Sequence, residues 1–303
     1  MPDLPKRMLG NTGMEVTTLA YGAMEMRGGP RGPEISDEEA DRVLNSVLDA
    51  GINFIDTSID YGRSEERIGK FISQRRGEYF LASKCGCVLG DERGHVHTAE
   101  NIRTGVENSL SLMKTDYLDL VQFHRSLAPE EFDEEGALSE VLKLREEGKV
   151  RFIGVSGTLP NLDAQIDMGV FDAFQVPYSA LQREHEEVIA KASAAGAGII
   201  IRGGAARGAP TDWESRTYYM IPGEQMRGTW EQADLDSLLD GMSRMEFTLR
   251  FTLSHPDLDA TIVGTRNLEH LQENIGFAEK GPLPGELYEE AKRRLAQAGS
   301  APA

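Results

Sequence analysis

Short apolar segments alternate with longer amphipathic segments along most of this chain, and that alternation constrains its fold more than any other feature. The apolar segments lie near residues 19–24, 53–56, 79–84, 118–123, 150–155, 172–176, 197–201 and 260–263. Helical patterns lie near 40–50, 64–75, 99–114, 135–147, 160–168, 184–195 and 233–254, and another begins near Asn267. Eight strands separated by helices predict a parallel sheet with right-handed crossovers, closed as an α/β fold of the (β/α)8 TIM barrel type. The strand segments are continuously apolar, as expected of strands covered on both faces.

The segments outside this alternation predict an addition at each end and one long loop. Turn residues between two short apolar pieces at 9–16 predict an N-terminal β-hairpin. A helical pattern followed by a polar tail at 281–303 predicts a C-terminal helix and tail beside a barrel core of residues 8–277. The Gly- and Pro-rich segment from Gly203 to Trp230 shows no clear period; we interpret it, and 209–230 in particular, as a functional lid, with a disordered loop as the alternative. No linker interrupts the chain, so residues 1–303 predict a single domain.

Acidic residues outnumber basic ones by 50 to 32 in this chain of 303 residues, which gives a formal net charge of −18. Nucleic acids and anionic membranes would be repelled, so we expect neither as a partner. The first residues lack the apolar stretch of a signal peptide, and no run approaches the roughly 18 apolar residues of a membrane span. A single glycine separates Cys85 from Cys87, so we expect no disulfide between them, and no Cys/His set has zinc spacing. We therefore expect no metal site and a reducing, cytoplasmic location.

Three successive predicted strands end in side chains that can take part in chemistry. The first ends at Asp56 and has Tyr61 on the adjoining loop, the second ends at Lys84, and the third ends at His124. Taken singly, the carboxylate suits a helix cap, the lysine a solvated rim and the histidine a hydrogen-bonded structural role. The carboxyl ends of barrel strands form one edge, where active sites lie. Three such strand ends in succession therefore favour an active site.

The same residues lie in motifs that resemble those of the aldo-keto reductases. The resemblance runs from Met8 to about Phe277. It rests on Gly-Ile-Asn-Phe-Ile-Asp-Thr-Ser-x-x-Tyr-Gly-x-Ser-Glu at 51–65, on the Lys84 and His124 strand ends, and on Ile-Val-Gly-Thr-Arg-Asn at 262–267. In that family a nicotinamide cofactor delivers a hydride to a carbonyl carbon while a tyrosine protonates the carbonyl oxygen. The resemblance thus implies an oxidoreductase that reduces a small-molecule aldehyde or ketone to an alcohol.

The resemblance also implies a role for each of the strand-end residues. Tyr61 would be the acid/base, Asp56 and Lys84 would tune it, and His124 would orient the carbonyl. A free tyrosine has a pKa near 10, and a cation held against its oxygen lowers that pKa and eases proton donation. We expect Lys84 to be this cation and Asp56 to hold it. Histidine stands where relatives that reduce C=C bonds carry glutamate, which favours C=O reduction.

The cofactor site implied by the resemblance lies along the same barrel edge. No Gly-x-Gly-x-x-Gly motif follows the first strand, so a Rossmann site is not expected. Ser156 and Gln175 match positions that contact the nicotinamide amide, although the residues alone would favour a capping serine and a buried glutamine. The other predicted cofactor-binding residues, of which the last two match adenine contacts, are Gly22, Arg202, Gly203, Ala205, Arg207, Gly264, Thr265, Arg266, His270, Glu273 and Asn274.

We expect NADP as the cofactor, with NAD as the alternative. Arg266 precedes the last helix of the barrel, whose N-terminus is a natural anion site, and can meet a 2′-phosphate there. A surface pair with Glu269 is the other interpretation of Arg266. Two residues depart from the family pattern: Arg202 stands where relatives often stack an aromatic ring on the nicotinamide, and His270 where they often carry Arg or Gln.

Two other functions compete with this one. Lys84 could be the Schiff-base lysine of a barrel aldolase, which borohydride trapping would reveal, although the pairing of Asp56 with Tyr61 speaks against it. A cofactor-binding regulatory or redox-sensing subunit with poor turnover is the second, and an assay with NADPH would separate it from a reductase. The sequence predicts neither the physiological substrate nor the oligomeric state.

Overall fold

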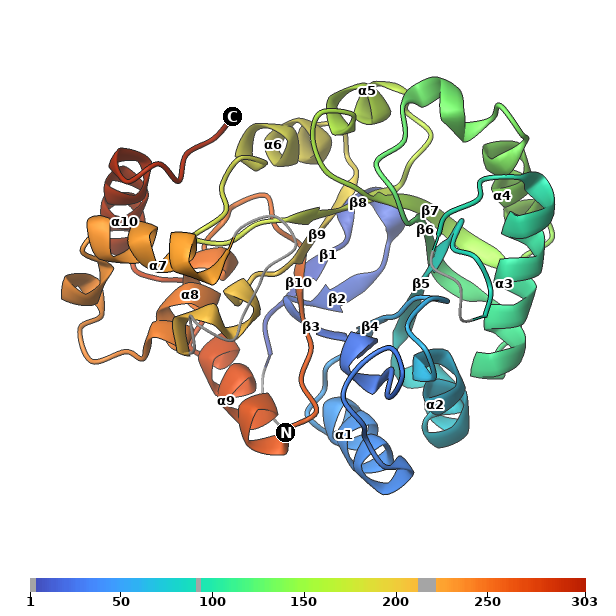
Figure 1. Ribbon diagram of the computed structural model, residues 1–303, viewed down its shortest axis with the longest axis horizontal. Helices are drawn as coiled ribbons and strands as arrows, with labels where there is room; N and C mark the ends of the chain where they lie inside the picture. The colour runs from blue at the N-terminus through green and yellow to red at the C-terminus, as the bar shows by residue number, and fades with distance from the viewer. Residues whose placement is uncertain (1–3, 91–93, 212–221) are drawn as a thin grey trace.

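Eight parallel strands close into a barrel in the order β10, β3, β4, β5, β6, β7, β8 and β9 (Figure 1). The structure is a computed structural model that describes residues 4–90, 94–211 and 222–303. The strands are β3 (Leu19–Gly22), β4 (Phe54–Asp56), β5 (Phe80–Cys85), β6 (Leu118–Phe123), β7 (Val150–Ser156), β8 (Ala173–Pro177), β9 (Gly198–Arg202) and β10 (Ala260–Val263). The predicted (β/α)8 barrel is confirmed.

Helices surround this barrel and connect its strands (Figure 1). They are α1 (Asp37–Asp49), α2 (Ser64–Phe71), α3 (Ala99–Met113), α4 (Ala137–Glu146), α5 (Leu162–Asp167), α6 (Glu186–Ala194), α8 (Arg244–Leu253) and α9 (Leu268–Glu279). A capping box is present at the start of α1: the Glu39 amide donates to Ser36 Oγ at 3.1 Å, and the Ser36 amide donates to the Glu39 carboxylate at 2.9 Å. These bonds satisfy amides that the first helical turn leaves unpaired.

Two predictions about the segment between β9 and β10 need correction. The helix predicted over 233–254 is not continuous: α7 (Gly223–Gln232) ends just before this range, and the range itself holds a 3₁₀ turn (Leu235–Leu238) and α8. Asp234 and Asp240 adopt left-handed backbone conformations, with φ of 49° and 45°, which an α-helix cannot contain. The segment 203–230 is also less irregular than predicted, because a 3₁₀ segment (Ala206–Thr211) and α7 occupy much of it. Residues 212–221 of the predicted lid lie outside the described residues.

The predicted N-terminal hairpin is present and lies at the amino ends of the barrel strands. Its strands β1 (Lys6–Met8) and β2 (Glu15–Thr17) pair antiparallel. Leu9, Met14 and Val16 pack in one buried cluster with strand residues that include Phe54 and Ile200. The hairpin therefore plugs the amino end of the barrel, and ligands have access to the opposite, carboxyl edge.

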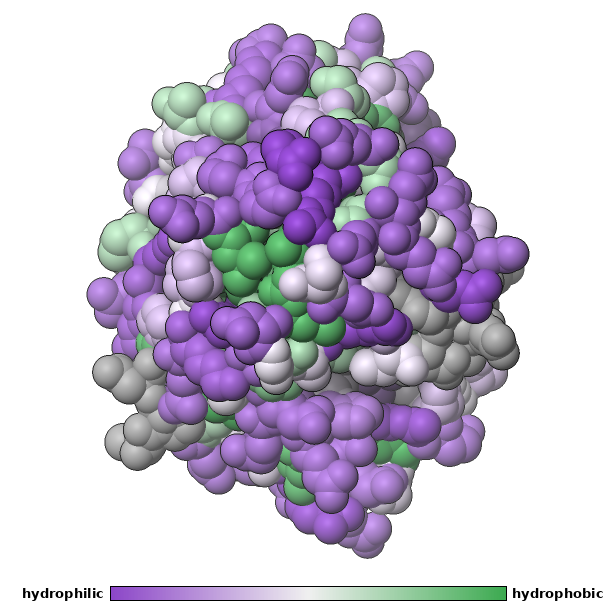
Figure 2. All heavy atoms as spheres, turned by 90° about the vertical axis from the view of Figure 1, so that its left-hand side faces the viewer, coloured by the Kyte–Doolittle hydropathy of each residue, from purple (hydrophilic) through white to green (hydrophobic). Residues whose placement is uncertain are grey.

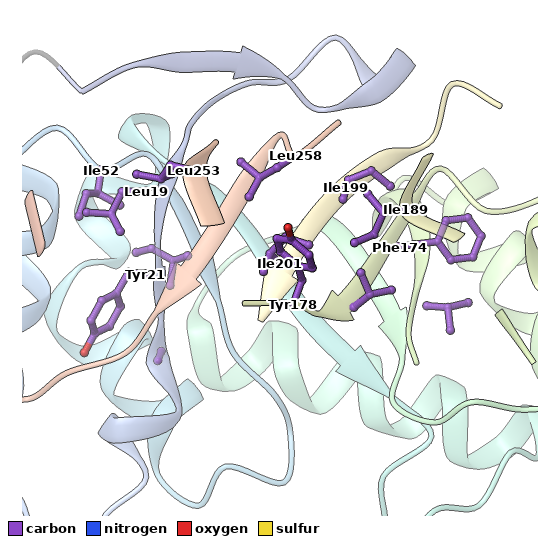
Figure 3. Close-up of a cluster of buried hydrophobic side chains, with 14 of the residues drawn as sticks. Leu19, Tyr21, Ile52, Phe174, Tyr178, Ile189, Ile199, Ile201, Leu253 and Leu258 are labelled. Atoms are coloured by element: carbon purple, nitrogen blue, oxygen red, sulfur yellow. The ribbon is translucent and has the colours of Figure 1, made fainter. Parts of the chain in front are cut away.

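A second and larger buried cluster fills the space between the strands and the helices. Figure 3 shows part of it, with Ile199 and Phe174 of the strands close to Ile189 of α6. The helix α10 (Gly285–Gln297) joins this layer through Tyr288, whose hydroxyl lies 3.2 Å from that of Tyr178. The surface over α7–α10 is mostly hydrophilic, with a small hydrophobic group near its centre (Figure 2). No described helix is long and apolar enough to cross a membrane.

Candidate active site

A buried ion pair joins Asp56 and Lys84 at the carboxyl ends of β4 and β5. The ammonium group of Lys84 donates to both carboxylate oxygens of Asp56 at 2.7 Å and to the carbonyl of Thr57 at 2.9 Å. The side-chain amides of Gln122 and Gln175 donate to the same carboxylate at 2.9 and 2.8 Å. Ladder pairing of Lys84 with Gln122 places them on adjacent strands, β5 and β6. Sequence reasoning missed Gln122, which carries no motif of its own.

Tyr61 lies above this pair on the loop that follows β4. Gly62 has a φ of +48°, and a Cβ there would lie 2.6 Å from the Arg27 carbonyl oxygen, so only glycine allows the loop to approach the chain after β3. The Lys84 ammonium lies 5.8 Å from the centre of the Tyr61 ring, and the His124 ring lies edge-on to it with centroids 6.0 Å apart. The structure thus brings all four residues of the predicted catalytic set together.

The surroundings of Tyr61 act on its acidity in the direction opposite to the one expected. Burial is the largest influence and raises the pKa of Tyr61 well above its ordinary value of 10; the charges of Asp56 and Asp60 raise it further. The charge of Arg202 lowers this pKa. Lys84 was expected to do so, but its three N–H groups are directed at Asp56 and Thr57.

His124 lies in a polar group that sequence reasoning did not assemble. Its Nδ1 lies 3.1 Å from Cys87 Sγ, 3.4 Å from Ser58 Oγ and 3.5 Å from Asp60 Oδ1. The ring of His95 is edge-on to that of His124, with centroids 5.5 Å apart. The position of Asp60 beside Tyr61 was a signal in the sequence. Cys87 and His95 gave none, because their linear spacing matches no known ligand pattern.

The titration of these neighbours follows from their burial and charges. Burial would raise the pKa of Asp60, but the hydrogen bonds and charge of His124, together with the Ser58 hydroxyl, hold it well below its usual range. Burial, and then the charge of Asp60, raise the pKa of the Cys87 thiol to about 12. Burial, followed by the charge of His124, lowers the pKa of His95. At neutral pH the group therefore contains a carboxylate, a protonated thiol and a neutral imidazole at His95.

The predicted nicotinamide end lies at the ends of β7, β8 and β9. Ser156 Oγ donates to the Gln175 side-chain carbonyl at 3.0 Å, and the Gln175 amide group donates to Asp56, so both predicted contacts join the catalytic network. Arg202 ends β9, and its Nε is buried without a hydrogen-bond partner among the residues that the structure describes. Such an orphaned donor fits a polar ligand group at this position. Gly203, Ala205 and Arg207 follow in the loop after β9.

The predicted phosphate end lies between β3, β10 and α9. The backbones of Gly22 and Gly264 approach so closely that a Cβ on Gly264 would lie 2.5 Å from the Gly22 carbonyl oxygen. Arg266 lines a cleft of about 400 Å³ with Arg42 and the start of α9. The other predicted residues near it are Thr265, which precedes α9, and His270, Glu273 and Asn274 on α9.

The side chain of Arg266 binds a backbone carbonyl and not the carboxylate of Glu269, which the surface-pair interpretation expected. Its guanidinium donates to the backbone carbonyl of Glu34 at 2.6 Å. Among the described residues, its hydrogen-bond partner is this carbonyl and not the carboxylate of Glu269. Arg266 therefore bridges the loop before α1 and the N-terminus of α9, at the edge of the cleft.

Comparison with known proteins identifies the family of this arrangement. The sequence model of the Aldo/keto reductase family matches residues 18–294. The chain belongs to the Aldo/keto reductase family. This aldo-keto reductase is similar to the uncharacterized oxidoreductase YqkF of Bacillus subtilis (27% identity, 93% of each chain) and to L-galactose dehydrogenase of Arabidopsis thaliana (26% identity, 91% of this chain and 88% of the relative). It also superposes on the holo form of aldo-keto reductase AKR11C1 from Bacillus halodurans with a TM-score of 0.82, at 25% identity over 96% of each chain.

The environment of Lys84 in this aldo-keto reductase suits an oxidoreductase better than an aldolase. A Schiff-base lysine must present an unprotonated amine to its substrate. The ammonium group of Lys84 is fully buried, and its three N–H groups are bound by Asp56 and Thr57, so its nitrogen is not open to a substrate carbonyl. Lys84 therefore supports the site and is not a candidate nucleophile.

Proposed function

We propose that this aldo-keto reductase reduces an aldehyde or ketone to an alcohol, with Tyr61 as the proton donor. The observation that carries the proposal is the position of Tyr61 between the Asp56–Lys84 pair and the ring of His124. Tyr61 holds its proton at neutral pH, as a general acid must before it reacts. His124 borders the same space, and its ring N–H can donate to the carbonyl oxygen and orient it.

The residues present fit a nicotinamide cofactor. Ser156, Gln175 and the Nε of Arg202, which has no partner among the described residues, would hold the nicotinamide end. Arg266 and the N-terminus of α9 would hold the adenosine phosphate, which favours NADP over NAD. When bound, the cofactor supplies the hydride that no side chain can provide.

The substrate class is inferred from the site and from the relatives. A tyrosine donor and a histidine suit a C=O group, and the likeness to L-galactose dehydrogenase supports including aldoses among the carbonyl compounds tested. The two cysteines of this chain are free, which supports a reducing location such as the cytoplasm.

Turnover by Tyr61→Phe tests the proposal. We expect the variant to bind NADPH like the parent and to reduce aldehydes and ketones at least about 100-fold more slowly, within the range of positioned proton transfer. NADPH absorbance reports turnover, and quenching of protein fluorescence reports binding. Tyr117→Phe is a matched control, because Tyr117 precedes β6 and so lies at the opposite edge of the barrel. Near-parental turnover by Tyr61→Phe would refute the assignment, and absence of turnover by the parent on every carbonyl would favour a regulatory subunit.

A further inference from the structure

Three side chains that can ligate a metal ion meet at the edge of the candidate active site. Cys87, His95 and His124 each offer one ligand atom, and these atoms lie within 4.8 Å of one another. Thiolate and imidazole are the ligands that zinc prefers. In tetrahedral zinc with bonds of about 2.0–2.3 Å, neighbouring ligand atoms lie roughly 3.5 Å apart. Cys87 Sγ is already 3.1 Å from His124 Nδ1, so His95 needs the larger adjustment.

The loop after β5 holds two of these ligands opposite each other. Cys87 and His95 form an antiparallel bridge. Hydrogen bonds on either side extend this pairing: the Val96 amide donates to the Gly86 carbonyl at 2.7 Å, and the Val88 amide donates to the Gly94 carbonyl at 3.0 Å. Directly paired residues of antiparallel strands present their side chains on the same face. The thiol and the imidazole are thus placed together by backbone pairing before any ion arrives.

The backbone of this loop is also tied to α3. The side-chain amide of Asn101 donates to the carbonyl of Cys87 at 3.2 Å and to that of Val96 at 2.8 Å. One side chain therefore joins both strands of the bridge, and His124 approaches from the end of β6. His95 is exposed, and turning its ring toward the other two ligands exchanges its stacking on His97 for coordination.

We propose that Cys87, His95 and His124 bind a zinc-type divalent cation that blocks the carbonyl pocket. On binding, a sulfur–metal bond replaces the S–H bond of Cys87 and the thiol proton passes to solvent, while each imidazole donates a nitrogen lone pair. Asp60, with Oδ1 3.5 Å from His124 Nδ1, adds a negative charge beside the cation. Three protein ligands leave a fourth position for water.

The inhibitory part of this proposal rests on the proposed function, because His124 is the residue assigned to orient the carbonyl oxygen. A cation bound to His124 would lie close to Tyr61, whose ring centre is 6.0 Å from that of the imidazole. An ion held by His124 would therefore restrict the ring that is assigned to orient the carbonyl oxygen.

Metal binding is tested on the whole chain without cofactor or substrate. Co²⁺ reports thiolate ligation by its charge-transfer absorption, and calorimetry with Zn²⁺ gives the affinity. We expect a single ion per chain and loss of the Co²⁺ band in Cys87→Ser. Zn²⁺ binding should weaken more than about tenfold in His95→Gln, because even the loss of a residue that hydrogen-bonds to a metal ligand costs roughly 10–100-fold in affinity. His97→Gln is the matched control, because His97 stacks on His95 at 6.2 Å but is not in the ligand set. Absence of the band in the parent, or equal losses in His95→Gln and His97→Gln, would overturn the site.

Inhibition is tested separately by NADPH-dependent carbonyl reduction. Zn²⁺ should inhibit the parent and His97→Gln competitively with the carbonyl compound, and should inhibit Cys87→Ser at least about tenfold less strongly. Equal inhibition of the parent and Cys87→Ser would overturn the blocking role. A chain that gives the Co²⁺ band but reduces no carbonyl would refute the proposed function and still support the site. A chain that reduces carbonyls but gives no Co²⁺ band would support the proposed function and refute the metal site.

Discussion

The ion pair between Asp56 and Lys84 allows a quantitative prediction, because both side chains are buried and their partners are known. Lys84 is 0% and Asp56 2% exposed. Lys84→Met deprives Asp56 Oδ2 of the ammonium donor, while Oδ1 keeps the amides of Gln122 and Gln175. Asp56→Asn leaves the ammonium facing a neutral amide and the carbonyl of Thr57. Removing one partner of a buried ion pair costs about 3–5 kcal/mol, so we expect each single variant to lose that much free energy of unfolding.

The double variant, Asp56→Asn with Lys84→Met, distinguishes pairing from packing. It removes both charges, so its loss of stability should be smaller than the sum of the single losses by about 1–3 kcal/mol. Urea unfolding followed by circular dichroism and tryptophan fluorescence measures all three variants, and an unchanged denaturant slope confirms that the same transition is compared. Lys191→Met, which breaks exposed pairs with Asp163 and Asp167, is the control and should leave the transition nearly unchanged. Single losses that add to within about 0.5 kcal/mol would refute the coupling.

Three further predictions concern the surroundings of His124, the cofactor and a buried acid. Asp60→Asn removes the carboxylate beside His124 Nδ1 and should lower kcat for carbonyl reduction about tenfold with little change in NADPH affinity, which steady-state kinetics can check. Arg266→Ala should weaken NADPH binding by roughly 1.5–3 kcal/mol and NADH binding hardly at all; equal losses in fluorescence titrations would show that Arg266 does not contact the 2′-phosphate. Burial raises the pKa of Glu65 from 4.5 to about 7, so the parent should lose stability as pH rises through that window. Relative to Glu65→Gln it should lose about 2–3 kcal/mol between pH 5 and pH 8 in urea unfolding, and parallel pH dependences would contradict this.

The strands and the positions of the strand-end residues could be predicted because their signals are local. Asp56, Lys84 and His124 each follow or end a short apolar run, and parallel strands bring such ends to one edge whatever the detailed packing. The capping box of α1 is likewise a local signal, because Ser36 and Glu39 lie only three residues apart. The break before α8 was missed, because Asp234 and Asp240 carry polar side chains that suit a helix surface, and only the backbone conformation reveals the interruption.

Contacts that depend on tertiary structure could not be predicted. The convergence of Gln122 and Gln175 on Asp56 depends on ladder register across several strands. The meeting of Cys87 with His95 depends on a loop that folds back on itself. No spacing along the sequence encodes either set of contacts, so a search for known ligand patterns misses both.

The acidity of Tyr61 shows why a charge pattern alone gives the wrong sign. The sequence places a lysine near the phenol and so predicts a lowered pKa, but burial outweighs the nearby cation and raises it. A phenol that stays protonated at neutral pH is a competent donor and a poor base. Carbonyl reduction needs the donor, whereas alcohol oxidation, the direction in the name of the related L-galactose dehydrogenase, needs phenolate to form first. Burial and the carboxylates of Asp56 and Asp60 oppose phenolate, and the charge of Arg202 offsets them only in part, so Tyr61 suits the proposed reduction.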